Sequence, residues 1–543
     1  MFEPKLNNVI AFGLLPLANL IIFYCLMTKE DQDLWHTDPN QYIASKDDIL
    51  DCYDYNIREI SLKTFSNIIE KYKNDAIQII MVIIDSLIFQ NDKSDVKKIY
   101  NNMISSTPTY VQKSLKEFDF SNLMNLNLQE IFPDDQKFEE LKHEVALLIL
   151  GHFAEDIVAY QENSGGFDFL ILYKSLLNVI IKSTSPYVAG RAIWAMSRLN
   201  TCTGANDFET NADMIQVFSG FLNQDFHLPV RLVAAKSLNN LVCKIIKDDG
   251  DMNAYFKASN IQTHEVHNQL IDILKYCSEQ TANLVLTTLK SLHKLDSSLI
   301  RMTAESISEP ILMLYQSSHN DVHASRVLID LMLQMLECEV AGKIFLAVFL
   351  PNCILYLQNC SQFLLTEHND IPFAEEESQL NFYISLLELL CQAIKRSNKK
   401  KFDKDLLFEA FPIAMHMVLN STNVIAVIKS TVCIKAYMLH MSSELVSKGY
   451  KNSIYKMLKK LLEPKETEIL SNYIGNIVMI TIEKIDQSSS NIELLTVALQ
   501  KMLKCSLPST LQGLALLFAR FIIRSPNDVL NYLTTTQIDT RMG

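Results

Sequence analysis

Helical periodicity recurs along this chain in segments of about 13 to 16 residues, each separated from the next by a polar turn. A helix this short is marginal in isolation, so each segment must share its apolar face with neighbours. Seven segment starts align at spacings of about 39 to 58 residues, centred on the ~40–47 residues of a HEAT or armadillo helix pair. The aligned starts are Val230, Asn283, Val322, Leu380, Val424, Leu470 and Thr510. This spacing predicts an all-α, armadillo-like HEAT-repeat superhelical solenoid built from helical hairpins.

The composition agrees with helices rather than with β structure. Only 13 Gly and 14 Pro occur among 543 residues. Turn-rich sandwiches and barrels need more of both, whereas helices joined by short polar turns need few. A compact core of this size would normally split into domains, but a solenoid core lengthens with each added unit. We therefore expect residues 1–543 to form a single solenoid without a separate catalytic domain.

The charge balance excludes several classes of partner. The chain has 49 Lys plus Arg and 62 Asp plus Glu, so its formal net charge is −13. This balance disfavours direct binding to nucleic acid or to an anionic membrane, and it favours a basic protein partner. The 11 Cys are scattered without a C-x-x-C pair, which indicates a reducing compartment, the cytosol or the nucleus.

One apolar run, from Val9 to Met27, is long enough to raise the alternative of a membrane anchor. It contains Gly13 and Pro16, and no basic cluster flanks it. Our interpretation is a buried helix from Leu17 to about residue 29, closed by a polar turn at residues 30–31, with no membrane insertion. The protein should then fractionate as soluble.

Acidic side chains gather in two windows. Residues 31–60 contain eight acidic and two basic side chains, and residues 344–394 contain six acidic side chains and no Lys or Arg. We expect acidic segments between helices near 36–56 and 362–379, whose field would attract basic ligands. A solvated surface loop is the alternative. The candidate contacts for a basic cargo are Asp47, Asp48, Asp51, Asp54, Glu375, Glu376 and Glu377.

Signals of catalysis are weak. No phosphate-binding loop or nucleophile elbow occurs, so we expect no enzyme activity and no cofactor. His264 and His267 are not spaced as a zinc helix, and His319 with His323 offers only two ligands, so no metal site is expected. The basic run 395–404 could be a localisation signal or a nucleic-acid patch, but a cationic helix end explains it better.

Three arginines occupy equivalent places near the starts of expected second helices: Arg58, Arg191 and Arg231. In stacked hairpins such an arginine commonly bonds an acidic side chain or a carbonyl of the next repeat, so we interpret all three as structural. Trp194 is interpreted as a packed wedge rather than a binding anchor.

Several collinear segments carry a family resemblance. The first contains Leu34 and Trp35, Asp38 to Ile43, Asp47, Asp48, Asp51 and Asp54, then Ile57 and Arg58. The others are residues 185–198, 229–231, 283–285, 409–412 and 461–464. These segments resemble the tryptophan and aspartate–proline motif of importin-β-type (karyopherin-β) nuclear transport receptors, and within that family they most resemble the importin-9 branch. The resemblance covers about residues 14 to 525, and 190–198 is its most specific part.

The resemblance implies a HEAT-repeat import receptor that carries basic cargo, such as histones or ribosomal proteins, through the nuclear pore. It also implies contact with Phe-Gly nucleoporins, control by the GTPase Ran, and shuttling between cytoplasm and nucleus at the nuclear envelope. The motif residues with structural roles would be Trp35, Asp38, Pro39, Arg58, Gly190, Arg191, Trp194 and Arg231.

Two departures from the family pattern affect that expectation. The amino-terminal repeats that grip Ran-GTP in this family have no counterpart before Met1, and the carboxy-terminal repeats also lack counterparts. We therefore expect a central fragment in which Ran-dependent cargo release is the activity least able to operate. The alternative function is a non-transport HEAT scaffold or regulatory subunit, which the composition favours equally.

Overall fold

The computed structural model describes residues 17–46 without 19, 57–88, 135–164, 169–203, 207–318 without 296, 322–366, 373–463, 477–485 without 479, and 492–535. Throughout these ranges the regular elements are helices, and no strand occurs among them. The chain forms two compact units, Met1–Leu299 and Ile300–Gly543. The expectation of an all-α fold of HEAT-type helical hairpins is confirmed. A single solenoid over residues 1–543 stays a prediction.

The helices of the first unit follow residues 17–24, which are also helical where they are described. They are α2 (Lys29–Thr37), α3 (Pro39–Lys46), α4 (Ile57–Tyr72), α5 (Asn74–Ile88), α10 (Asp135–His152), α11 (Ala154–Ser164), α12 (Phe169–Lys182), α13 (Pro186–Cys202), α14 (Phe208–Gly220), α15 (Leu228–Lys247), α16 (Met252–Ala258), α17 (Thr263–Leu274) and α18 (Glu279–Leu295).

The boundary between the units falls near the start of α19. The second unit contains α19 (Ser297–Ser317), α20 (Val322–Glu337), α21 (Glu339–Leu365), α22 (Phe373–Lys400), α23 (Lys404–Phe408), α24 (Phe411–Asn420), α25 (Val424–His440), α26 (Ser442–Ser447), α27 (Lys451–Leu462), a π-helical turn (Thr481–Ile485), α30 (Ile492–Met502), α31 (Pro508–Arg524) and α32 (Pro526–Thr535).

In the first unit, α5, α10, α13, α15 and α18 pack side by side as one row. The hairpin partners α12, α14 and α17 lie against α13, α15 and α18 respectively. Each row helix therefore buries one face on its own partner and two flanks on its neighbours. This is how short amphipathic helices build a continuous core.

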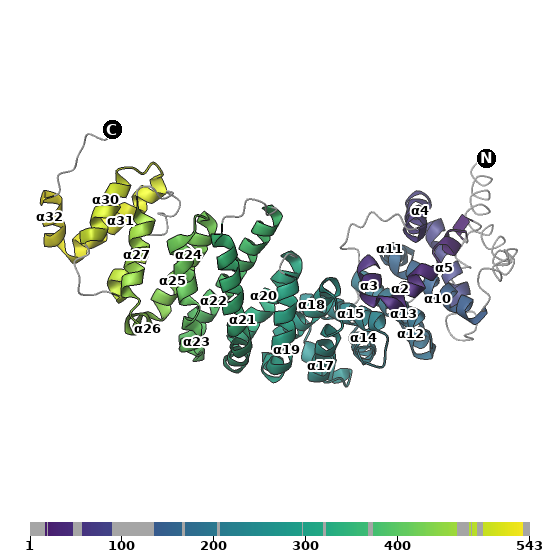
Figure 1. Cartoon of the computed structure of the whole chain (residues 1–543). Coiled ribbons are helices and arrows are strands. Elements are labelled where there is room, and N and C mark those ends of the chain that lie inside the picture. Colours follow the sequence, from purple (N-terminus) through teal and green to yellow (C-terminus); the bar gives the residue numbers. More distant parts are fainter. Residues whose placement is uncertain are drawn as a thin grey trace. The chain divides into compact units, whose positions relative to one another are not determined.

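The second unit repeats the arrangement. Helices α20, α22 and α25 form one row, and α21, α24, α27 and α30 form another (Figure 1). Six of the seven predicted repeat starts lie in described residues, and each is in the amino-terminal part of a helix of either unit. The remaining start, Leu470, lies outside the described residues.

Lysines join successive hairpins by capping helix ends. The Lys244 ammonium donates to the carbonyls of Asn200 and Thr203 at 2.6 and 3.0 Å, at the carboxyl end of α13. Lys460 donates in the same way to the Val418 carbonyl at the end of α24, at 2.9 Å. Carbonyls at a helix end have no intrahelical partner, so these ammonium groups satisfy them from the following repeat. The Lys501 ammonium caps the end of α27 through the Glu463 carbonyl at 2.9 Å.

The scarcity of glycine is possible because other residues occupy left-handed turns. Lys73, Asp249, Asn260 and Lys401 have φ values of 45°, 56°, 55° and 51° at helix ends. A left-handed residue with a Cβ costs roughly 1–2 kcal/mol, a cost that the packing of the joined helices must exceed. Lys401 lies within the basic run 395–404, whose first residues form the last turns of α22 and whose last, Lys404, begins α23. The interpretation of that run as a cationic helix end agrees with this position.

The apolar amino-terminal run differs from its prediction. Its helix ends near Tyr24, and Thr28 begins a new helix, α2, so Glu30 and Asp31 lie in the first turn of α2 rather than in a closing turn. Carboxylates at that position interact favourably with the helix amino terminus. Ile21 and Ile22 of this helix are buried, whereas Leu17, Leu20 and Tyr24 are exposed, so the helix is amphipathic rather than buried along its whole length as predicted. Residues 1–16 lie outside the described residues.

One described helix is long and apolar enough to cross a membrane, and it is α21 rather than the amino-terminal run. Many of its side chains are buried, including Phe345, Phe349 and Cys353. It packs against α20, α22 and α24. These contacts are those of a core helix in the second unit.

Candidate protein-interaction site

The turn into α2 opens the motif region of the first unit. The Asp31 backbone amide donates to Thr28 Oγ1 at 3.1 Å, and the Thr28 amide donates to Asp31 Oδ2 at 3.5 Å. This reciprocal pair is a capping box, which satisfies two orphan donors of the helix. Asp38 then ends α2 and begins α3, because its carboxylate accepts from the Gln41 amide at 3.0 Å, while Pro39 occupies the first helical position. Two of the motif residues thus define a sharp helix–turn–helix corner.

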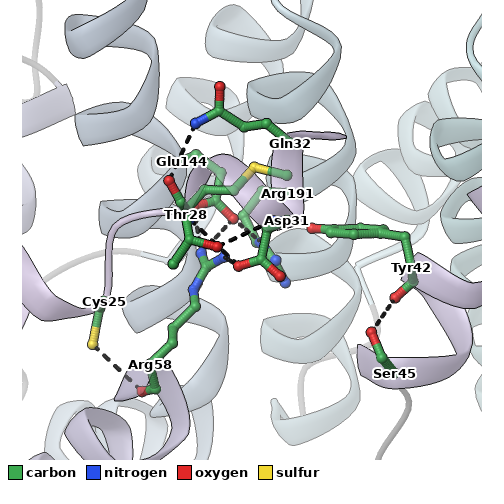
Figure 2. A network of polar contacts seen from close by, with 10 residues as sticks. Cys25, Thr28, Asp31, Gln32, Tyr42, Ser45, Arg58, Glu144 and Arg191 are labelled. Atoms are coloured by element: carbon green, nitrogen blue, oxygen red, sulfur yellow. Dashed lines mark hydrogen bonds and ion pairs between the residues drawn. The ribbon is translucent and has the colours of Figure 1, made fainter. Parts of the chain in front are cut away.

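Beneath that corner lies a buried ion network (Figure 2). Arg58 of α4 donates to both carboxylate oxygens of Glu144 in α10, at 2.7 and 2.5 Å. Arg191 of α13 donates its Nε hydrogen to the same carboxylate at 2.8 Å. Asp31 approaches the Arg58 guanidinium at 4.0 Å. Two arginines and two carboxylates from four helices therefore form one charge-balanced cluster.

The network is buried, so each of its charges depends on its partners for compensation. Arg58 and Glu144 are only 3% and 1% exposed. Burial lowers the pKa of Arg58, but Glu144, Tyr42 and Asp31 together raise it by more, so the net shift of this pKa is upward. Arg58 remains charged under any ordinary condition. Losing one partner would therefore leave a buried charge poorly compensated.

Trp35 packs on the same corner through aromatic contacts. Its ring lies edge-on to Tyr42 at 4.9 Å and to Tyr187 at 5.0 Å between centroids. A Cβ on Gly190 would lie 3.4 Å from the Trp35 ring, so the absence of a side chain at Gly190 lets the indole approach α13. The cleft beside this cluster has an empty volume of about 280 Å³, its open mouth included, and is lined by Trp35, Tyr42, Glu144, Tyr187, Gly190, Arg191 and Val233.

Trp194 occupies a different place from Trp35. Its half-buried ring lies under the Arg191 guanidinium, 5.1 Å from the ring centroid, and against Gly151 of α10. A Cβ on Gly151 would overlap that ring, which means that only glycine fits there. In this geometry Trp194 fills the space between α10 and α13.

Arg231 joins two further repeats. Its Nε donates to the Leu222 carbonyl at 2.9 Å, and its Nη2 donates to Asp272 of α17 at 2.9 Å. Burial raises the pKa of Asp272, but the hydrogen bonds and positive charges of Arg231 and Lys275 together lower it by more, so this pKa lies below its usual value. Arg231 thus bonds forward to the next repeat, whereas Arg191 bonds back to α10.

The candidate acidic contacts fall in two places. Glu375, Glu376 and Glu377 are exposed on the first turns of α22, because that helix begins at Phe373. Where it is described, the acidic segment expected between helices near 362–379 is therefore mostly helical: its first residues end α21 and its last residues begin α22. Within the described ranges no cation lies within ion-pair distance of these three glutamates. Asp47, Asp48, Asp51 and Asp54 lie outside the described residues, and α3 occupies part of the expected segment 36–56.

No group of three potential ligands for a metal ion occurs within the part of the chain that the structure describes. His267 instead stacks on His293 of α18, with their Nε2 atoms 2.5 Å apart in the core. His319 lies outside the described residues. Sequence reasoning missed Glu144 and Asp272 as partners of the motif arginines, and it missed the contacts of Asn40 with Tyr276, Ser278 and Thr281. One signal for Glu144 was available, since it directly precedes the apolar run 145–150, which favours its burial, and a buried Glu needs a cation partner.

Comparison with known proteins gives a consistent result. No protein-family model matches the chain. Importin-9 of Drosophila melanogaster is 19% identical over 540 residues, covering 98% of this chain and 47% of the relative. The resemblance to the importin-β family is confirmed.

This chain spans about half the length of the curated relative that it matches. Among solved structures it is similar to Kap121p bound to Nup53p, with a TM-score of 0.42, 13% identity and coverage of 89% of this chain and 45% of that one. It is also similar to Kap121p bound to Pho4p, with a TM-score of 0.35, 12% identity and coverage of 98% and 57%.

Proposed function

We propose that this chain is a protein-binding receptor of the nuclear import type, which carries basic protein cargo on clustered carboxylates. The observation that carries the proposal is the position of Glu375, Glu376 and Glu377. All three are exposed on one helix start, and no described cation neutralises them. Carboxylates that are held on a helix can bind lysines and arginines of a partner without first breaking an ion pair with a described residue.

The similarity to importin-9 along nearly the whole chain supports a transport receptor over other binding proteins. On this proposal the partners include histone-like or ribosomal-protein-like cargo and Phe-Gly nucleoporins. The protein would shuttle between cytoplasm and nucleus and act by binding rather than by catalysis. Ran control stays an expectation for the intact family; in this chain it would require that Ran-GTP contact an element whose conformation also affects cargo.

The test is a titration of a fluorescently labelled core histone with the full chain at several salt concentrations. The variant Glu375→Gln/Glu376→Gln/Glu377→Gln removes three charges without changing side-chain size. A matched control, Asp225→Asn/Asp248→Asn/Asp249→Asn, removes three exposed charges from the first unit. We expect the glutamate variant to weaken binding by about tenfold and to lower its salt dependence, while the control changes little. Equal loss in both variants would indicate a net-charge effect and would contradict a site on α22.

A non-transport scaffold is the second candidate function. The row packing of helices in both units favours it equally, since repeat stacks present extended surfaces to many partners. Affinity purification from nuclear and cytoplasmic extracts separates the two. Recovery of basic nuclear proteins with nucleoporins supports the receptor, and recovery of one enzyme or coat assembly supports the scaffold.

A further inference from the structure

Helices α2 and α3 do not continue the row of hairpins in the first unit. They lie across it (Figure 1). Helix α3 contacts both α15 and α18, and Trp35 and His36 of α2 contact α13. A segment near the start of the described chain therefore touches three successive repeats. Such a crossing element can resist changes in the angle between those repeats.

The first end of this crossing is aromatic. Trp35 is 4% exposed and contacts Tyr187 of α13, while the gap left by Gly190 admits its ring beside Val230 of α15. His36 Nε2 and the Tyr187 hydroxyl share a hydrogen bond of 2.7 Å. The ring of His36 also meets that of His227, 5.8 Å between centroids, at the start of α15. These contacts tie α2 to two adjacent repeats.

The second end is a single amide. Asn40 Nδ2 donates to the Tyr276 carbonyl at 3.0 Å, and Asn40 Oδ1 accepts from the Ser278 amide at 3.0 Å. The Thr281 hydroxyl donates to the same oxygen at 2.5 Å. Both ends of the Asn40 side chain are thus used in the turn between α17 and α18, some 240 residues away in the sequence. No other common side chain offers a donor and an acceptor at this length and in this planar geometry.

The crossing helices bury few apolar side chains of their own, four in α2 and α3 together. On α3 the buried side chains are Tyr42, Ile43 and Ala44, and the large anchor on α2 is Trp35. Elements with few buried apolar contacts open at lower free energy than the core does. The row helices beneath, by contrast, have long runs of fully buried residues.

We propose that α2 and α3 form a releasable brace across three repeats of the first unit, with Asn40 as its clasp. When the clasp is closed, the brace holds α13, α15 and α18 at one spacing. When the clasp opens, the brace separates from the repeats, first at Asn40 and then along the helices as far as Trp35. The three repeats can then change their relative angle, and a helical stack adapts to a bound protein by this motion.

The test uses Trp35 as a reporter at the opposite end from the clasp. The chain has two tryptophans, so a Trp194→Phe background leaves Trp35 as the single indole. In that background Asn40→Ala should raise acrylamide quenching of Trp35 by about twofold or more and shift its emission to the red. Asn40→Asp keeps the acceptor for Ser278 and Thr281 but loses the donor to Tyr276, so its effect should be intermediate. The matched control is Gln41→Ala, an exposed neighbour on the same helix.

Hydrogen exchange of the full chain without the Trp194 substitution gives the second measurement. A brace predicts faster exchange both at residues 276–282 and in α2 for Asn40→Ala. Faster exchange at residues 276–282 alone, with Trp35 quenching unchanged, would mean that Asn40 is only a local cap of α18 and would overturn the proposal. Unchanged exchange at both places would overturn it as well. If Asn40→Ala fails to fold, Asn40→Asp decides between these outcomes by the same two readouts.

Discussion

Arg58 and Glu144 are separated by 86 residues in the sequence, and in the core of the first unit Arg58 Nη2 donates to both carboxylate oxygens of Glu144, at 2.7 and 2.5 Å. The pair joins α4 to α10, and the Glu144 carboxylate also receives Arg191 of α13. One buried carboxylate thus holds three helices together, and it neutralises charges that the sequence places far apart.

Replacing that carboxylate should destabilise the first unit severely. We expect Glu144→Gln to lower its free energy of unfolding by about 3–5 kcal/mol, because Arg58 and Arg191 keep their charges in a low-dielectric site. Both tryptophans belong to the first unit, so urea unfolding followed by tryptophan fluorescence reports on it directly. The control is Glu139→Gln, which removes an exposed pair with Lys142 and should cost less than about 1 kcal/mol. Similar losses in the two variants would contradict a buried network.

A side chain at Gly151 should be poorly tolerated. Gly151→Ala would drive its Cβ into the Trp194 ring, so we expect a loss of about 1–3 kcal/mol. Adding Trp194→Leu should recover part of this loss, since the smaller side chain makes room. Gly220→Ala serves as the control, because nothing lies within 4 Å of its Cβ, and it should be neutral or slightly stabilising. The same urea titration measures the first two variants through Trp35.

The buried histidine pair should make stability depend on pH. Burial, and then the nearby His293, lower the pKa of His267 to about 3. An unfolded histidine titrates near pH 6.5, so between that pH and about 3 the unfolded chain binds the extra proton. The contribution of His267 to the free energy of unfolding is therefore fully present above pH 6.5. It falls as pH decreases below 6.5, by about 1.4 kcal/mol per pH unit.

His267→Leu should flatten this part of the pH profile of unfolding. The control His264→Gln lies on the same helix, α17, and should leave the profile unchanged. An unaltered slope in His267→Leu would show that other groups cause the acid sensitivity.

Asp272 should make the free energy of unfolding depend on pH in a more acidic range. Its pKa in the folded state lies below its unfolded value, because the hydrogen bonds and positive charges of Arg231 and Lys275 together outweigh its burial. The stabilisation is then present above the unfolded pKa and is lost as pH falls through the folded pKa. We expect Asp272→Asn to cost about 1 kcal/mol at neutral pH and little in strong acid. A difference between the variant and the parent that does not shrink with acid would contradict the pairing.

The local pattern of the sequence determined the architecture. The apolar period, the repeat spacing and the scarcity of glycine were sufficient to predict helical hairpins, because each of these depends on residues within one hairpin or its neighbour. The predicted end of the amino-terminal helix, near residue 29, was wrong by more than a turn, because the helix ends near Tyr24 and the capping box of Thr28 and Asp31 starts a new helix there.

The contacts that join distant parts of the chain were decided only by the tertiary structure. The sequence singled out Arg58 and Trp35 as motif residues, but not Glu144 as the partner of Arg58, nor Asn40 as the clasp on Ser278. Helical periodicity specifies which face of a helix is buried, and it is the same in every repeat. It cannot specify which of several buried faces meets a given arginine or amide, because that choice depends on how successive hairpins stack in three dimensions.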